Sequence, residues 1–118
     1  MAKITNEMVK CAYEVAKEVY SGKFSRSEGK TEISLLTGMG IGSANDYITV
    51  LLAMLRGEEY HRTINTFATE YYLENILNDF GQEYLSKALS AVKRHVKYYA
   101  TLGHGNLVSI EDVASKFE

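Results

Sequence analysis

Proline and tryptophan are absent from this 118-residue chain, and cysteine occurs once, as Cys11. A lone cysteine cannot form an intramolecular disulfide and the amino-terminal residues carry no apolar signal region, so we expect a cytoplasmic protein. No apolar run approaches the roughly 18 residues of a membrane-spanning helix, which argues against a membrane protein. With no proline-rich or low-complexity linker, and with the length of one ordinary domain, the chain is expected to form a single helical domain over residues 1–118.

A basic surplus is also missing. Fifteen acidic residues outnumber thirteen basic ones, which gives a formal net charge of −2 and a pI near 5.9. The molecule as a whole therefore has no long-range attraction for nucleic acid, and any such binding must come from a local patch.

Apolar residues recur at helical spacing through most of the chain, while strand patterns are nearly absent. We expect an all-α fold, a compact orthogonal bundle of five to six helices. Side-chain caps predict four helix starts, at Thr5, at the Ser25–Glu28 capping box, at Ser43 and at Ser109. A fourth helix is expected to begin between residues 63 and 66 and to end before Gly81, and a fifth to cover residues 82–101.

The second and third expected helices resemble a helix-turn-helix in outline. Six residues, 37–42, separate them, however, where that motif has three or four, and the third helix has no basic residue before Arg56. An ordinary helical hairpin is the favoured interpretation, with a divergent helix-turn-helix as the alternative. The glycines at 38, 40 and 42 fit a turn between packed helices better than a phosphate-binding loop, because no strand precedes them and no lysine follows.

Patterns for catalysis and metal binding are missing. His61, His95 and His104 are far apart in the sequence, and Cys11 has no partner at a matched spacing. We therefore predict that the protein is not an enzyme and has neither a cofactor nor a metal site. His95 falls in the apolar stripe of the fifth helix, which favours a hydrogen-bonded core histidine.

Basic and aromatic residues gather in two segments, one before the fourth helix and one along the fifth. The fifth helix carries four basic residues and one acidic residue, Glu83. Cations suit phosphate contacts, and amphipathic rings suit stacking on bases or sugars. The predicted nucleic-acid-binding residues are Tyr60, His61, Arg62, Lys87, Lys93, Arg94, Lys97, Tyr98 and His104. The alternative is that the tyrosines rest on the edge of the core and the basic face is only solvated.

Six segments occur in a characteristic order: AYEVAKEVYSG (12–22), TGM (37–39), GSANDYI (42–48), YHRTIN (60–65), YYLENI (71–76) and HVKYY (95–99). In this order the chain resembles, over nearly its whole length, a small helical domain that accompanies HNH-type nucleases in bacterial restriction proteins. The resemblance implies DNA engagement or target selection in defence or mobile-element biology, with cleavage left to a separate nuclease module whose cysteine, histidine and asparagine ligands this chain does not contain.

The prediction for function is therefore a non-catalytic DNA-binding specificity or accessory domain of bacteria or phage. DNA is the expected partner, together with a nuclease module or a second copy of the chain. The alternatives are a protein-interaction or homodimerisation module, and a phage inhibitor of a host enzyme.

Overall fold

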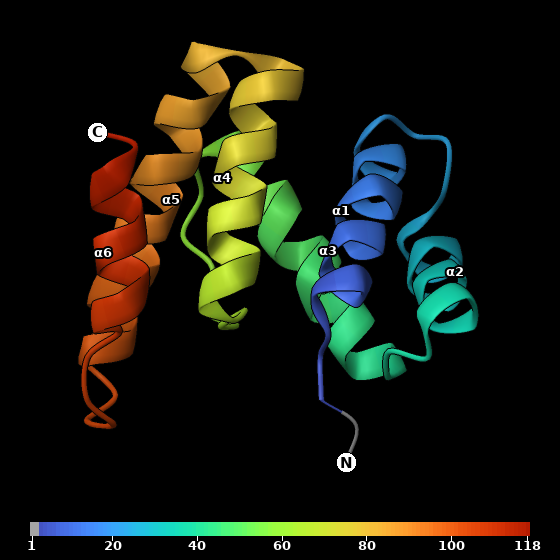
Figure 1. The fold of residues 1–118 in the computed structure, drawn as a ribbon, viewed down its shortest axis with the longest axis horizontal. Helices are drawn as coiled ribbons and strands as arrows, with labels where there is room; N and C mark the ends of the chain where they lie inside the picture. The colour runs from blue at the N-terminus through green and yellow to red at the C-terminus, as the bar shows by residue number, and fades with distance from the viewer. Residues whose placement is uncertain (1–2) are drawn as a thin grey trace. The chain divides into compact units, whose positions relative to one another are not determined.

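A computed structural model describes residues 3–118, which form six α-helices and no strand (Figure 1). The prediction of an all-α fold with five to six helices is confirmed. Among the residues described, no helix is both long and apolar enough to cross a membrane. The helices are α1 (Asn6–Tyr20), α2 (Arg26–Thr37), α3 (Ile41–Arg56), α4 (Thr66–Phe80), α5 (Gln82–Ala100) and α6 (Val108–Lys116).

The contacts within the chain divide it into two compact units, the first ending at Leu52 and the second beginning at Ala53. Helix α3 therefore contributes its residues up to Leu52 to the first unit and its last turn to the second. The single domain expected over residues 1–118 stays a prediction.

In the first unit, α1 and α2 lie side by side (Figure 1). Helix α1 buries one stripe, whereas α2 buries only Gly29 and Ile33. A Cβ atom at Gly29 would lie 2.5 Å from Val19 Cγ2 and 3.2 Å from Ile48 Cδ1. The glycine that weakens α2 as an isolated helix is thus the point where α2 packs closely against α1 and α3.

Two of the predicted caps are confirmed. The Met8 backbone N–H donates to Thr5 Oγ1 at 3.2 Å, and Ser25 and Glu28 form the reciprocal capping box. Two other predicted starts are wrong, because α3 begins at Ile41 and α6 at Val108, which places Ser43 and Ser109 inside these helices. Helix α4 begins within the predicted range, and the Asn65 side chain caps it by accepting from the Ala68 N–H at 2.8 Å.

The early start of α3 leaves only residues 38–40 between α2 and α3. The six-residue gap expected from the sequence is therefore wrong, and the turn has the length of a helix-turn-helix turn. The second helix of such a motif needs a free face to enter a DNA groove. Every residue from Tyr47 to Leu55 except Thr49 is buried, so α3 has no such face, and the favoured helical hairpin is the better description.

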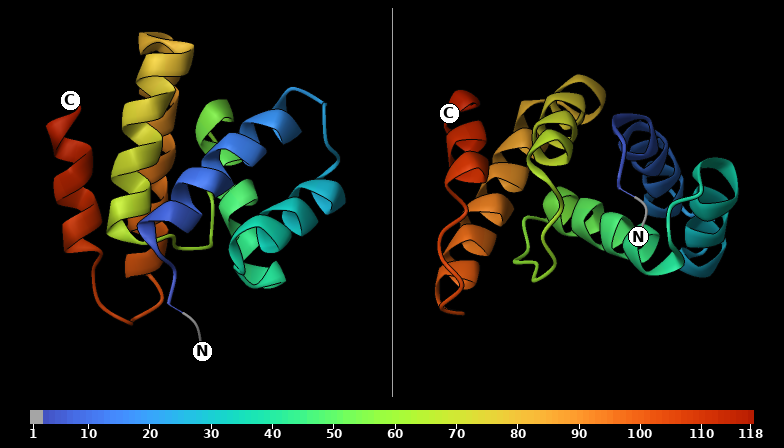
Figure 2. Two further views of the ribbon diagram at one scale, coloured as in Figure 1. Left: turned by 45° about the vertical axis from the view of Figure 1, so that its right-hand side comes forward. Right: turned by 60° about the horizontal axis from the view of Figure 1, so that its bottom comes forward.

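In the second unit, α4 and α5 form an antiparallel hairpin, and α6 packs beside both (Figure 2). A single residue, Gly81, joins α4 to α5 with φ 94° and ψ −179°, a conformation essentially restricted to glycine. Most residues of the expected apolar stripes are buried, but Phe67 and Val96 are half-buried and Leu77 is 37% exposed. Packing against α4 and α6 buries one side of α5 and leaves the other side exposed. Helix α5 carries five of the nine predicted nucleic-acid-binding residues.

Candidate nucleic-acid interface

One face of α5 lines a shallow depression on the surface. The lining residues recur every three or four positions, so they project from one side of the helix: Ser86, Leu89, Ser90, Lys93, Arg94 and Lys97. Three cations and two hydroxyls supply donors of the kind that bind phosphate oxygens. The structure thus brings together three of the four basic residues predicted on this helix. This set is called the α5 basic face below.

Lys93 already has an anionic partner. Its Nζ lies 2.9 Å from Glu118 Oε2, and the two side chains are 53% and 45% exposed. Such exposed pairs contribute only about 0–1 kcal/mol, since water and salt screen them. A phosphate could therefore replace the Glu118 carboxylate at little cost.

Lys87 flanks the α5 basic face without lining it. The Lys87 ammonium lies over the Tyr84 ring, 4.8 Å from its centroid. Lys87 precedes Arg94 by seven residues, or two helical turns, which places it about 10 Å along the helix. It extends the positive surface toward the start of α5.

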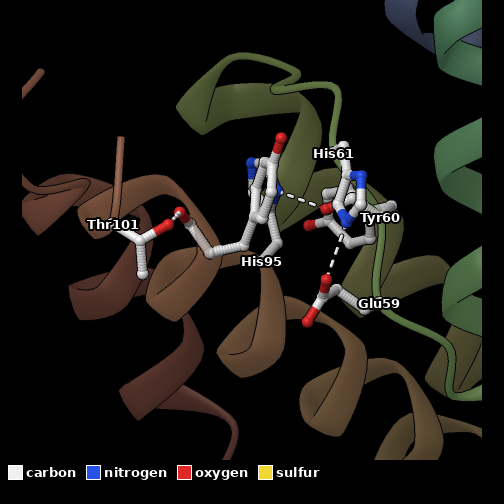
Figure 3. Close-up of polar contacts among 6 residues, drawn as sticks. Glu59, Tyr60, His61, His95 and Thr101 are labelled. Carbon is white, nitrogen blue, oxygen red and sulfur yellow. Dashed lines mark hydrogen bonds and ion pairs between the residues drawn. The ribbon is translucent and has the colours of Figure 1, made fainter. Parts of the chain in front are cut away.

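The segment before α4 brings a second group to α5 (Figure 3). His61 Nε2 donates to Glu59 Oε2 at 2.7 Å. The imidazole also stacks on the Tyr98 ring, with centroids 3.8 Å apart and planes 12° apart. Tyr98 follows Arg94 by four residues and so lies one turn along the same side of α5. The predicted residues His61 and Tyr98 are therefore neighbours of the α5 basic face.

Tyr60 points the other way. Its side chain is 3% exposed, and its ring stacks on His95 with centroids 4.3 Å apart. Burial raises the pKa of the Tyr60 phenol well above its ordinary value. The prediction that Tyr60 offers a ring to a base is wrong, because this segment is not helical and adjacent side chains diverge, Tyr60 inward and His61 outward.

His95 is a core residue, as predicted, and is 1% exposed. Its Nδ1–H donates to the Tyr60 carbonyl at 2.6 Å, so in the neutral ring Nε2 accepts from the Thr63 hydroxyl at 2.8 Å. Burial lowers the pKa of His95 below its ordinary value, which keeps this neutral form populated. These two hydrogen bonds anchor the segment that carries His61 to α5. Figure 3 shows the bond between His95 and the Tyr60 carbonyl.

The last two predicted residues have different positions. Arg62 is exposed beside His61. His104 leans on Tyr99, with ring centroids 6.4 Å apart. Two residues turn a helix by about 200°, so Tyr99 lies on the side of α5 away from Lys97. The structure therefore does not bring His104 to the α5 basic face.

Four contributors were not predicted: Ser86, Ser90, Glu59 and Glu118. The serines have a signal in the sequence, since they precede Lys93 and Lys97 at helical spacing. Glu118 has none, because the fold brings it to Lys93 from 25 residues away. Glu59 contacts His61 two residues on, and this spacing in a non-helical segment does not by itself indicate a contact. Within residues 3–118, no three histidine, cysteine or acidic side chains come together to hold a metal ion.

Comparisons with protein families, curated proteins and solved structures find no match to this chain. The resemblance to the domain that accompanies HNH-type nucleases stays a prediction.

Proposed function

We propose that the chain is a non-catalytic DNA-binding module that contacts phosphates through the α5 basic face. Lys93, Arg94 and Lys97 supply the charge, and Ser86 and Ser90 supply neutral donors between them.

One observation carries this proposal. On a chain of net charge −2, three cations share one depression on a single helix face. Concentrating like charges costs electrostatic energy, which the Glu118 carboxylate offsets in part at Lys93 and an anionic ligand would offset further. DNA phosphates are such a ligand, and each phosphate contact made by a lysine or arginine also releases a condensed counterion.

The setting of this activity follows from the resemblance alone. In that setting the module selects or holds DNA for a restriction, defence or phage process, and a separate nuclease performs any cleavage. The α5 basic face needs no cofactor for this role.

Fluorescence anisotropy with a labelled oligonucleotide at low salt tests the proposal. Replacing Arg94 and Lys97 by glutamate should weaken binding by about 10- to 100-fold and leave the melting temperature nearly unchanged, because both side chains are exposed. The double variant Lys10→Glu/Lys23→Glu is the matched control, with the same change in net charge on exposed residues of the first unit. Equal effects of the two double variants would refute a specific role for α5.

A homodimerisation module is the second candidate. The observation in its favour is the exposure of apolar side chains at the end of α2 and the start of α3, where Leu35 is 77%, Leu36 63% and Ile41 44% exposed. Exposed apolar patches on soluble proteins often mark interaction sites. Sedimentation that depends on protein concentration, and that Leu35→Glu abolishes, would favour a second copy of this chain as the partner.

A further inference from the structure

His61 presents an aromatic surface beside the α5 basic face. One face of its imidazole is covered by the Tyr98 ring, 3.8 Å away, yet 56% of the side chain is exposed. The opposite face of the imidazole is therefore open to solvent. A planar group placed there would extend an existing two-ring stack.

The imidazole is held before any ligand arrives. Glu59 accepts from its Nε2 at 2.7 Å, and Tyr98 covers one of its faces. The backbone of the preceding residue, Tyr60, is fixed by the 2.6 Å bond from His95. A ring oriented in advance loses little conformational entropy when a ligand stacks on it.

The charges around His61 select the type of group that can stack there. Glu58 and Glu59 are exposed next to it. These two carboxylates outnumber the one cation adjacent to His61 in the sequence, Arg62, so they disfavour a phosphate there but not an uncharged base. Along α5, Lys93, Arg94 and Lys97 favour phosphate. The residue after Lys97 is Tyr98, whose ring stacks on His61. The surface thus separates a phosphate-binding part from a base-stacking part.

We propose that this surface binds single-stranded DNA, with phosphates along Lys93, Arg94 and Lys97 and one unpaired base stacked on the open face of His61. The inference rests on the proposed function and names the form of nucleic acid. In an intact duplex each internal base is covered on both faces by its neighbours, so only a single strand can offer such a base. A basic track combined with an aromatic platform is the usual arrangement of proteins that bind single strands without sequence preference.

Binding of short fluorescent oligonucleotides, measured by anisotropy at low salt, tests the inference. The probes are a single-stranded thymidine oligonucleotide, the same length made abasic, a blunt duplex hairpin and a uridine RNA oligonucleotide. The thymidine strand should bind at least about tenfold more tightly than the duplex. His61→Ala should weaken binding to the thymidine strand by about 5- to 100-fold and leave the abasic strand unaffected. His61→Tyr, which keeps a ring, should restore most of the loss.

The outcomes distinguish this inference from the proposed function. If the duplex and the single strand bind equally and His61→Ala changes neither, while Arg94→Glu/Lys97→Glu weakens both, then α5 binds phosphates and the stacking inference is wrong. If no probe binds, both are wrong. Tighter binding of the RNA probe, with the same dependence on His61, would support stacking and make RNA the ligand. An unchanged melting temperature for His61→Ala shows that the loss is not due to unfolding.

Discussion

At the scale of single residues, His95 fixes the segment between α3 and α4, because both of its ring nitrogens bind that segment. Its partners, the Thr63 hydroxyl and the Tyr60 carbonyl, lie 32 and 35 residues away in the sequence. Burial disfavours the charged form of this imidazole, so the arrangement is most stable when the ring is neutral, with one nitrogen donating and the other accepting.

This arrangement predicts that the free energy of unfolding falls at acid pH. Burial lowers the pKa of His95 in the folded state, so below about pH 6.5, the ordinary value, the unfolded chain binds the proton more readily. The contribution is complete above that pH and is lost as the pH falls through the folded-state pKa. The hydrogen bond to the Tyr60 carbonyl opposes this lowering of the His95 pKa, His61 adds to the lowering, and Glu59 opposes it.

Urea unfolding between pH 7.5 and pH 5 measures the effect. His95→Gln should flatten the dependence on pH in this range, whereas His104→Gln, on an exposed residue, should leave it as in the parent chain. A parallel decrease in the His95→Gln variant would show that other groups cause the acid sensitivity.

The burial of His95 could be predicted from the sequence, because Val92 and Val96 place it in an apolar stripe of helical period. The inward turn of Tyr60 could not. Residues 58–65 have no helical period, so nothing local distinguishes the ring of Tyr60 from that of His61. Only the position of His95 across the fold separates the buried ring from the exposed one.

At the scale of the helices, the packing of α2 against α1 and α3 depends on the absence of a side chain at Gly29. Replacing Gly29 by alanine should favour the isolated helix by about 1 kcal/mol. The new Cβ would meet Val19 Cγ2 at 2.5 Å, and a β-branched side chain in a packed helix interface has little freedom to move. We expect a net destabilisation of about 1–3 kcal/mol in chemical denaturation.

Gly42→Ala is the matched control for this substitution. Gly42 lies in the first turn of α3, is exposed, and has no heavy atom within 4 Å of a Cβ built on it. Its replacement should be neutral or should stabilise by up to about 1 kcal/mol. If both variants stabilise the chain, the close packing at Gly29 is not as tight as the structure indicates.

Helix starts could be predicted where a side-chain oxygen accepts a hydrogen bond from a backbone N–H of the first turn. Thr5 and Ser25 accept backbone N–H groups within their own segments, and that chemistry is visible in the sequence. Helices α3 and α6 begin without such a signal, at Ile41 and Val108. Glycines 40 and 42 suggested a turn by propensity, but packing of the apolar residues of α3 outweighs propensity.

At the scale of the whole molecule, the acidic surplus bears on the α5 basic face most directly through Glu118, which forms an ion pair with Lys93. Its carboxylate competes with any phosphate for Lys93. Replacing Glu118 by glutamine should therefore increase DNA affinity by about two- to fivefold, the range that exposed pairs support.

Glu74→Gln on α4 separates this contact from the change in net charge. Both variants remove one negative charge from an exposed position, but only Glu118 bonds to Lys93. The affinities are compared by anisotropy in one buffer, since salt alters both. Equal increases would mean that net charge alone governs binding.

The Lys93–Glu118 pair also makes the end of α6 sensitive to the ligand. A phosphate that takes Lys93 releases the Glu118 side chain, and thermodynamic linkage requires the coupling to act equally in both directions. Bound DNA should then accelerate amide hydrogen exchange in residues 115–118 while it protects the anchored segment around His61. Binding of DNA would thus stabilise the segment around His61 and destabilise residues 115–118. Hydrogen exchange at residues 115–118 would then indicate whether DNA is bound to α5, although these residues do not contact the DNA.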